Sequence, residues 1–194
     1  DIKETLAFMG VEFDLWVSEK SLHQRGLVEK VIKLLEEKGY TYTQDGALWF
    51  KSSNFGDDKD RVLIRSDGTP TYFAGDIAYH YYKYERGFEK VINLWGADHW
   101  GYLPRLKGAL KALGIPEDWL KVEFVQMVRL FSGGKEIRMS KRTGEFITLR
   151  ELLEEVGVDA VRFIFLTKRS DTPLDFDIDL VKQNTAENPV FYVQ

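Results

Sequence analysis

The sequence predicts an α/β fold, and three observations support this class. Residues 90–130 read as a strand, a glycine-containing turn, a helix and a second strand, which is the βαβ pattern of a parallel sheet. Asp45-Gly46 joins two short runs rich in aromatic and β-branched residues, so an antiparallel hairpin is expected there. Beyond residue 150, apolar residues recur at helical spacing. We therefore expect a parallel sheet with a small antiparallel insertion and a helical C-terminal region.

Composition excludes several classes of protein. Hydrophobic residues make up 44% of the 194 positions and charged residues 30%, as in ordinary globular proteins with one domain or one and a half. The absence of cysteine rules out disulfides and thiolate metal sites, and it fits a reducing compartment. A net charge of -4 rules out a generally basic nucleic-acid binder. No apolar run approaches the roughly 18 residues that a membrane span needs.

Both ends of the chain suggest a fragment of a longer protein. The sequence begins at Asp1 without a methionine, and a helical pattern is still running at Gln194. Near the start, the alternation of apolar and polar residues over positions 11–17 predicts a strand or an extended segment. A helix that contains Val28 to Leu35 follows and is stopped by Gly39, with Ser18 or Ser21 as a cap.

The middle of the chain is predicted to be β-structure followed by a helix. The strands expected are 40–43, 47–50, 61–65 and 71–74, the last two joined by a turn at 66–68. A helix from Asp76 to Tyr84 comes next, and the strand of residues 90–95 ends in Gly96. After the helix that ends before Gly114, one strand is expected over residues 122–130.

The last third is predicted to hold a glycine hairpin and two helices. The hairpin turn is 131–135, and residues 146–149 read as extended. One helix leads to Gly157, and Asp159 caps the next, from Ala160 to Lys168. The acidic residues from Asp171 to Asp179 read as solvated or capping, because the glycine and terminal glutamate of a calcium loop are absent.

The basic stretch Arg138-Met139-Ser140-Lys141-Arg142-Thr143-Gly144 has no apolar face that packing would explain. Three cations, two hydroxyls and a glycine fall within seven residues. Such a loop suits a polyphosphate, since cations supply charge and hydroxyl and backbone N–H groups supply directed hydrogen bonds. The alternative is a solvated basic turn. Lys141, beside Ser140, is the expected cation for charge that develops on a pyrophosphate.

Two further clusters are candidates for ligand binding. In the turn after the 90–95 strand, Gly96 allows close approach to the backbone, Asp98 can accept from ribose hydroxyls, and His99 can face a phosphate or carboxylate. An ordinary strand–helix turn is the alternative. Asp76 can pair with a guanidinium, and Tyr72 can stack on it or hydrogen-bond to it. Alternatively, Asp76 is only a helix cap and Tyr72 a core residue.

Several stretches, in order along nearly the whole chain, resemble arginyl-tRNA synthetases of class I. Residues 138–142 resemble the KMSKS signature in its KMSKR form, with Arg138 in place of the first lysine. The other matching stretches are Phe13-Asp14, 45–49, 71–80, 95–99, 155–163, 174–177 and 188–194.

The resemblance implies the C-terminal half of a Rossmann-like catalytic domain. Residues 1–69 would be a connective insertion, 70–149 the second half of the nucleotide-binding domain, and 150–194 a helical stem that leads to an anticodon-binding domain. The implied enzyme is a cytoplasmic arginine–tRNA ligase, whose partners are L-arginine, ATP with accompanying Mg²⁺, and tRNA(Arg). No dedicated protein metal site is expected.

By the same resemblance, particular residues acquire roles. The implied catalytic residues are Arg138, Ser140 and Lys141. The implied ATP contacts are Gly96, Asp98, His99, Met127, Val128 and Met139. The implied arginine contacts are Tyr72, Asp76 and His99.

One departure from the family pattern limits what this chain is expected to do. The HIGH signature is absent, because none of the three histidines stands in an H-x-G-H arrangement. We therefore expect the N-terminal half of the active site to be missing and the chain alone to have little or no aminoacylation activity. The alternatives are a class I synthetase for another amino acid and a non-catalytic nucleotide- or RNA-binding paralogue.

Overall fold

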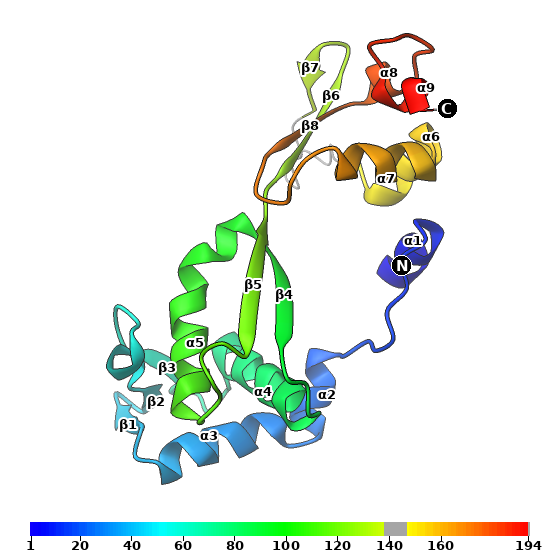
Figure 1. Cartoon of the computed structure of the whole chain (residues 1–194). Helices are drawn as coiled ribbons and strands as arrows, with labels where there is room; N and C mark the ends of the chain where they lie inside the picture. Colours follow the sequence, from blue (N-terminus) through cyan, green and yellow to red (C-terminus); the bar gives the residue numbers. More distant parts are fainter. Residues whose placement is uncertain (138–146, 194) are drawn as a thin grey trace. The chain divides into compact units, whose positions relative to one another are not determined.

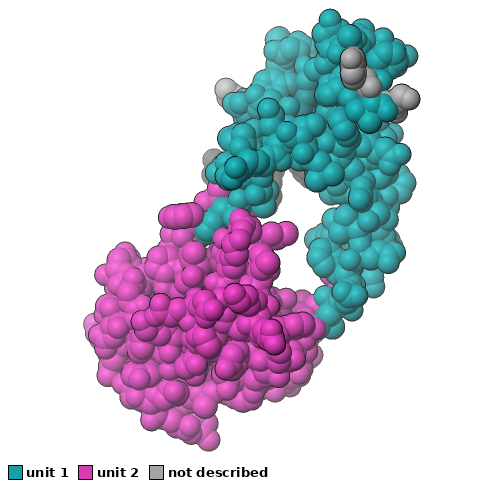
Figure 2. All heavy atoms as spheres, viewed as in Figure 1, with its two compact units in different colours: residues 1–15, 124–194 teal, residues 16–123 magenta. Residues whose placement is uncertain are grey.

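The computed structural model describes residues 1–137 and 147–193, which form two compact units. One unit comprises residues 16–123, and the other comprises residues 1–15 with 124–194 (Figure 2).

The unit of residues 16–123 begins with two helices, a hairpin and a third strand (Figure 1). Its first elements are α2 (Glu19–Gln24), α3 (Leu27–Glu37), β1 (Thr41–Gln44), β2 (Ala47–Phe50), η1 (Ser52–Phe55) and β3 (Arg61–Ile64). The strands form an antiparallel sheet in the order β1-β2-β3. The predicted hairpin is confirmed, with Asp45 and Gly46 both at positive φ (52° and 74°), the conformation for which Asp-Gly turns are selected.

Helix α4 (Tyr72–Glu85) starts one turn earlier than the sequence predicted. The expected strand at 71–74 is wrong, because only an isolated bridge between Ile64 and Pro70 follows the turn. Thr71 caps the helix instead: its hydroxyl accepts from the backbone N–H of Ala74 at 3.3 Å and donates to the carbonyl of Val62. The aromatic residues that resemble a strand are therefore the first turn of a helix.

A βαβ unit completes this part of the chain. It consists of β4 (Val91–Gly96), η2 (Ala97–Tyr102), α5 (Leu103–Ala112) and β5 (Leu120–Val125), and the two strands form one sheet. The N–H of Val91 donates to the carbonyl of Trp119 at 2.8 Å, so both strands begin at the same end and run parallel, as predicted. The single strand expected over 122–130 is instead two strands, since β5 ends at Val125.

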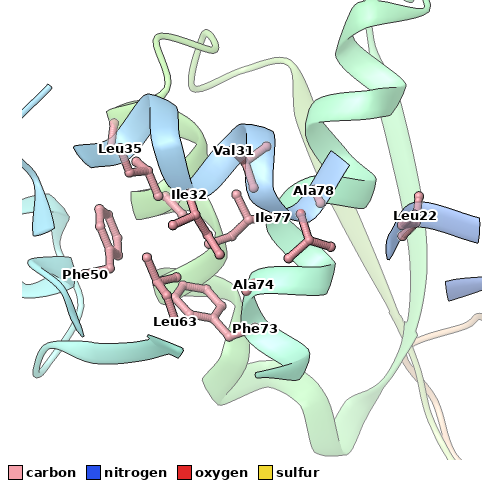
Figure 3. Close-up of a cluster of buried hydrophobic side chains, with 13 residues drawn as sticks. Leu22, Val31, Ile32, Leu35, Phe50, Leu63, Phe73, Ala74, Ile77 and Ala78 are labelled. Atoms are coloured by element: carbon pink, nitrogen blue, oxygen red, sulfur yellow. The ribbon is translucent and has the colours of Figure 1, made fainter. Parts of the chain in front are cut away.

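The core of this unit lies between α3, α4 and the small antiparallel sheet (Figure 3). The predicted stripe of α3 is buried, with Leu35 fully enclosed, and it packs against Phe50, Leu63 and Ile77. Fully burying a side chain of this size stabilises a fold by roughly 1.5–3 kcal/mol. This packing fixes α4, and α4 in turn carries the candidate ligand residues.

The second unit is built on a parallel strand pair and helices. Its elements are α1 (Ile2–Phe8), β6 (Val128–Ser132), β7 (Lys135–Glu136), α6 (Leu149–Val156), α7 (Val158–Leu166), β8 (Leu174–Asp177), α8 (Ile178–Val181) and α9 (Pro189–Val193). Strand β6 runs parallel to its partner β8 and antiparallel to its partner β7. Gly133 and Gly134, both at positive φ, form the predicted hairpin turn between β6 and β7.

Three local predictions for this unit need correction. Leu149 is helical rather than extended, because Thr148 and Glu151 form a reciprocal capping box at the start of α6. Asp159 lies in the first turn of α7 but Gly157 is its N-cap. The C-terminal region predicted to be helical also contains the strand β8, whereas the capping role predicted for the acidic residues is confirmed at Asp177, which caps α8.

Residues 11–17, where a strand or extended segment was expected, form an irregular connection. Ser18 precedes α2 in an extended conformation but makes no side-chain cap hydrogen bond.

Candidate functional site

A cavity of about 330 Å³ lies beside the first two turns of α4. Three of its lining residues, Tyr72, Asp76 and Tyr79, are spaced four and three positions apart, so they share one face of the helix. The other lining residues are Val17, Glu19, Leu22 and Gly75. The structure thus brings together Tyr72 and Asp76, as the sequence predicted. Tyr72 is 77% exposed, so it is not a core residue. Asp76 is the fifth residue of α4, whose N-cap is Thr71, so it is not a helix cap either.

Asp76 is a half-buried carboxylate held by one strong hydrogen bond. The phenol of Tyr102, at the end of η2, donates to Asp76 Oδ2 at 2.5 Å. Burial raises the pKa of Asp76, while the Tyr102 bond opposes that shift because it favours the charged form. The nearby Glu19 carboxylate raises this pKa further, and His99 and Lys83 lower it. A bound cation would relieve the cost of keeping this carboxylate charged.

Glu19 is a second carboxylate in the cavity that sequence reasoning missed. It stands in the first turn of α2, where an acidic residue ordinarily stabilises the positive end of the helix dipole. Its position in the sequence therefore did not indicate a ligand-binding role. A Cβ added at Gly75 would lie 3.3 Å from Glu19 Oε1, so Gly75 leaves room for this carboxylate against α4. Two carboxylates and two tyrosine rings in one cavity suit an organic cation.

A chain of hydrogen bonds joins the same helix, α4, to strand β4. Nδ1 of His80, which is 3% exposed, lies 2.7 Å from the carbonyl oxygen of Asp76. Its Nε2 lies 2.6 Å from Asn93 Nδ2, and Lys83 Nζ donates to Asn93 Oδ1 at 2.9 Å. Lys83 thereby orients the amide of Asn93 with its NH₂ toward His80. Burial lowers the pKa of His80 to about 4 and that of Lys83 to about 8.

The turn after β4 holds Gly96, Asp98 and His99 close together, as predicted. A Cβ at Gly96 would lie 2.6 Å from Asp98 Oδ1, so only glycine fits while Asp98 keeps its position. Asp98 Oδ2 and His99 Nε2 are 3.8 Å apart, and both side chains are mostly exposed. The turn is a 3₁₀ segment that leads directly into α5. His99 is near enough to Asp76 to lower its pKa electrostatically.

The remaining predicted residues lie in the other unit or beyond the described residues. Met127 and Val128 stand where β6 begins, 70% and 37% exposed, and the Met127 carbonyl accepts from Leu174 N at 3.4 Å. The predicted catalytic and nucleotide residues of the basic loop fall outside the described part of the chain: Arg138, Met139, Ser140 and Lys141.

Within residues 1–137 and 147–193, no three His, Cys, Asp or Glu side chains are grouped closely enough to hold a metal ion. In the same part of the chain, no helix is both long enough and apolar enough to cross a membrane.

The family model for the catalytic domain of class I tRNA synthetases, type R, matches residues 3–176. The chain belongs to this family. The resemblance to arginyl-tRNA synthetases is therefore confirmed, and with it the α/β class I fold.

Curated relatives agree with this assignment. An arginine–tRNA ligase of Aquifex aeolicus is 68% identical over 194 residues, which are all of this chain and 33% of that protein. An arginine–tRNA ligase of Desulforudis audaxviator is 58% identical over 193 residues, 34% of its length. The chain thus spans about a third of these relatives.

Solved structures share the fold. A crystal structure described as an arginyl-tRNA synthetase from Campylobacter jejuni superposes with a TM-score of 0.89 at 42% identity, covering 99% of this chain and 42% of that one. Thermus thermophilus arginyl-tRNA synthetase superposes with a TM-score of 0.71 at 20% identity, covering 94% and 41%, which supports the fold alone.

Proposed function

We propose that the protein carrying this chain activates arginine with ATP and transfers it to tRNA(Arg), and that the cavity beside α4 binds the arginine side chain. The observation that carries this proposal is the pair of carboxylates, Glu19 and Asp76, in one cavity with Tyr72 and Tyr79. A guanidinium is planar, always charged and rich in donors, so it can satisfy two carboxylates while its face meets an aromatic ring. A neutral side chain would leave Glu19 without a cation and Asp76 with only its hydrogen bond from Tyr102, at a large cost.

Each residue of the cavity has a distinct part in this proposal. Asp76 accepts from the guanidinium, and Glu19 accepts from a second edge of the same group. Tyr72 is exposed at the rim, where its ring can cover the bound side chain. His99 contacts the polar end of the amino acid.

The nucleotide is proposed to lie along the Gly96 turn. Gly96 admits close approach of the ligand, Asp98 accepts from the ribose hydroxyls, and His99 faces a phosphate or the amino acid carboxylate. Backbone groups of Met127 and Val128 are proposed to line the adenine pocket. Met139 is proposed as a further ATP contact. Mg²⁺ is proposed to arrive bound to the ATP phosphates, and no protein ligand is assigned to it.

The proposed chemistry has two steps. An oxygen of the arginine carboxylate attacks the α-phosphorus of ATP, and the bond from that phosphorus to the bridging oxygen breaks to release pyrophosphate. A ribose hydroxyl at the tRNA 3′ end then attacks the carbonyl carbon of the adenylate, loses its proton and displaces AMP. Arg138, Ser140 and Lys141 are proposed to stabilise negative charge on the departing pyrophosphate. Positioning and electrostatics supply the catalysis, without a covalent enzyme intermediate.

The chain alone is proposed to have little or no aminoacylation activity, because it lacks the HIGH signature. We further propose that residues 1–69 form a connective region, 70–149 the second half of the catalytic domain and 150–194 the stem toward the anticodon-binding domain.

The test is ATP–pyrophosphate exchange by the longest natural polypeptide that carries this sequence, with each of the twenty amino acids and with tRNA(Arg) present. Arginine alone should support exchange, and Asp76→Asn should lower kcat/KM for arginine at least about 100-fold, since it removes the charge of one partner in a buried pair. Asp45→Asn is the matched control, because Asp45 lies in the β1–β2 hairpin at a positive φ that asparagine tolerates. Exchange with a different amino acid, or an unaffected Asp76→Asn variant, would refute the proposal.

A further inference from the structure

The Tyr102 side chain joins the cavity to the turn that precedes α5. Its hydroxyl donates to Asp76 Oδ2 at 2.5 Å, across 26 positions of sequence. Asp76 Oδ1 accepts no hydrogen bond from the described residues. The phenol therefore fixes the rotation of the carboxylate while leaving one oxygen available to a ligand.

The ring of Tyr102 is itself held on three sides. It meets Phe73 edge-on at 6.2 Å between centroids and Trp95 at 5.9 Å. The guanidinium carbon of Arg105 lies 5.1 Å from its centroid. Phe73 is buried in the main core of the unit, so the phenol is placed by packing that does not depend on a ligand. Burial and the neighbouring Asp76 raise the pKa of the Tyr102 phenol, so its hydroxyl keeps its proton and acts as the donor.

We propose that Tyr102 is a positioning residue for substrate selection: it holds the Asp76 carboxylate in the one rotation that presents Oδ1 to a guanidinium. This inference rests on the proposed function of the cavity. The guanidinium then meets one oxygen of Asp76 and the separate carboxylate of Glu19, rather than both oxygens of Asp76. Such a split arrangement favours a broad planar cation over a compact ammonium group, whose three donors radiate from a single atom.

The Tyr102 hydrogen bond opposes the electrostatic cost of keeping Asp76 charged. Burial and Glu19 on α2 both disfavour the charged form of Asp76, whereas His99 on η2 and Lys83 on α4 favour it. Tyr102 is the strongest of the groups that keep the carboxylate charged. Without the phenol, Asp76 should bind a proton at higher pH and lose its fixed orientation.

The test is Tyr102→Phe in the intact protein, which deletes one oxygen and keeps the ring packing. Tyr42→Phe is the matched control, because the Tyr42 phenol is also hydrogen-bonded to an aspartate, Asp60, outside the cavity. Two quantities are measured: the pKa of Asp76 in the ligand-free protein, by carboxyl ¹³C NMR, and the Kd of arginine as a function of pH. A third series repeats the arginine titration with Asp76→Asn.

In Tyr102→Phe the pKa of Asp76 should rise, because the hydrogen bond that favours the charged carboxylate is lost, and the pH below which arginine affinity falls should rise with it. At pH 7 the Kd of arginine should increase about 10-fold, as expected for loss of a hydrogen bond to a charged group. Tyr42→Phe should change neither quantity.

An unchanged pKa of Asp76 would overturn the inference directly. A raised pKa with an unchanged arginine profile would also overturn it, because the phenol would then act on Asp76 without consequence for the ligand. If Asp76→Asn also binds arginine normally, the proposed function of the cavity fails as well, and the ligand-free titration still reports on Tyr102 alone.

Discussion

His80 should make the stability of this chain fall steeply between pH 7 and pH 4. The ring is 3% exposed and lies between the Asp76 carbonyl and the Asn93 amide. With the carbonyl accepting from Nδ1–H, Nε2 must accept from Asn93, whose orientation Lys83 fixes. A second proton would put two donors face to face in a buried site, so the folded state resists protonation.

The magnitude follows from the two pKa values. Burial lowers the pKa of His80 from its usual 6.5 to about 4 in the folded chain, so the unfolded chain binds more protons between these values. Stability therefore rises with pH across this window and is lost on acidification. Linkage gives a loss of about 2 kcal/mol between pH 7 and pH 5, and of about 3 kcal/mol by pH 4.

Urea denaturation at closely spaced pH values would measure this effect, with His80→Gln as the variant that removes the titrating group. The variant should be less stable than the wild type at pH 7, and this difference in stability should shrink by about 2 kcal/mol on going to pH 5. His23→Gln, at a less buried histidine of α2, is the control and should follow the wild-type curve. Parallel pH curves for wild type and His80→Gln would show that His80 does not cause the loss of stability at low pH.

Three further changes have outcomes that the structure specifies. Asp76→Asn should weaken arginine binding about 100-fold in calorimetry. The ligand-free variant should be at least as stable as the wild type at pH 7, because the charged form of a carboxyl with a raised pKa is unfavourable in the folded state. A less stable variant would contradict this. Gly96→Ala should weaken ATP binding without changing the urea midpoint, since its Cβ would lie 2.6 Å from Asp98 Oδ1; unchanged nucleotide affinity would count against the turn as a nucleotide site. Thr148→Ala should cost about 1 kcal/mol in urea denaturation by removing the capping box with Glu151, and Glu151→Ala combined with it should add little.

Local patterns predicted the elements whose signals are short-range. The Asp45-Gly46 hairpin and the apolar stripe of α3 depend on residues within a few positions of one another, and the βαβ order is a succession of such local patterns. The structure confirms all three. The start of α4 was misassigned because Tyr72 and Phe73 favour strands by propensity. The cap made by Thr71 and the packing of Phe73 against Phe50 outweigh that preference.

The candidate site was predicted only in part, and the residues that were missed reach it through tertiary packing. Tyr72 and Asp76 lie four positions apart, so their proximity follows from helical geometry once α4 is assigned. Glu19 and Tyr102 lie far from Asp76 in sequence and reach it through the packing of α2 and η2. Nothing in the local sequence around Glu19 distinguishes it from an ordinary acidic residue at a helix start.

The central claim is that the cavity beside α4 selects a guanidinium, and citrulline tests it most directly. Citrulline has nearly the shape of arginine but carries a neutral ureido group, so it cannot pair with Glu19 and Asp76 as a cation does. Calorimetric titration of both compounds into the intact protein should give a Kd for citrulline at least about 100-fold higher than that for arginine. Equal affinities, or no binding of arginine, would contradict the account.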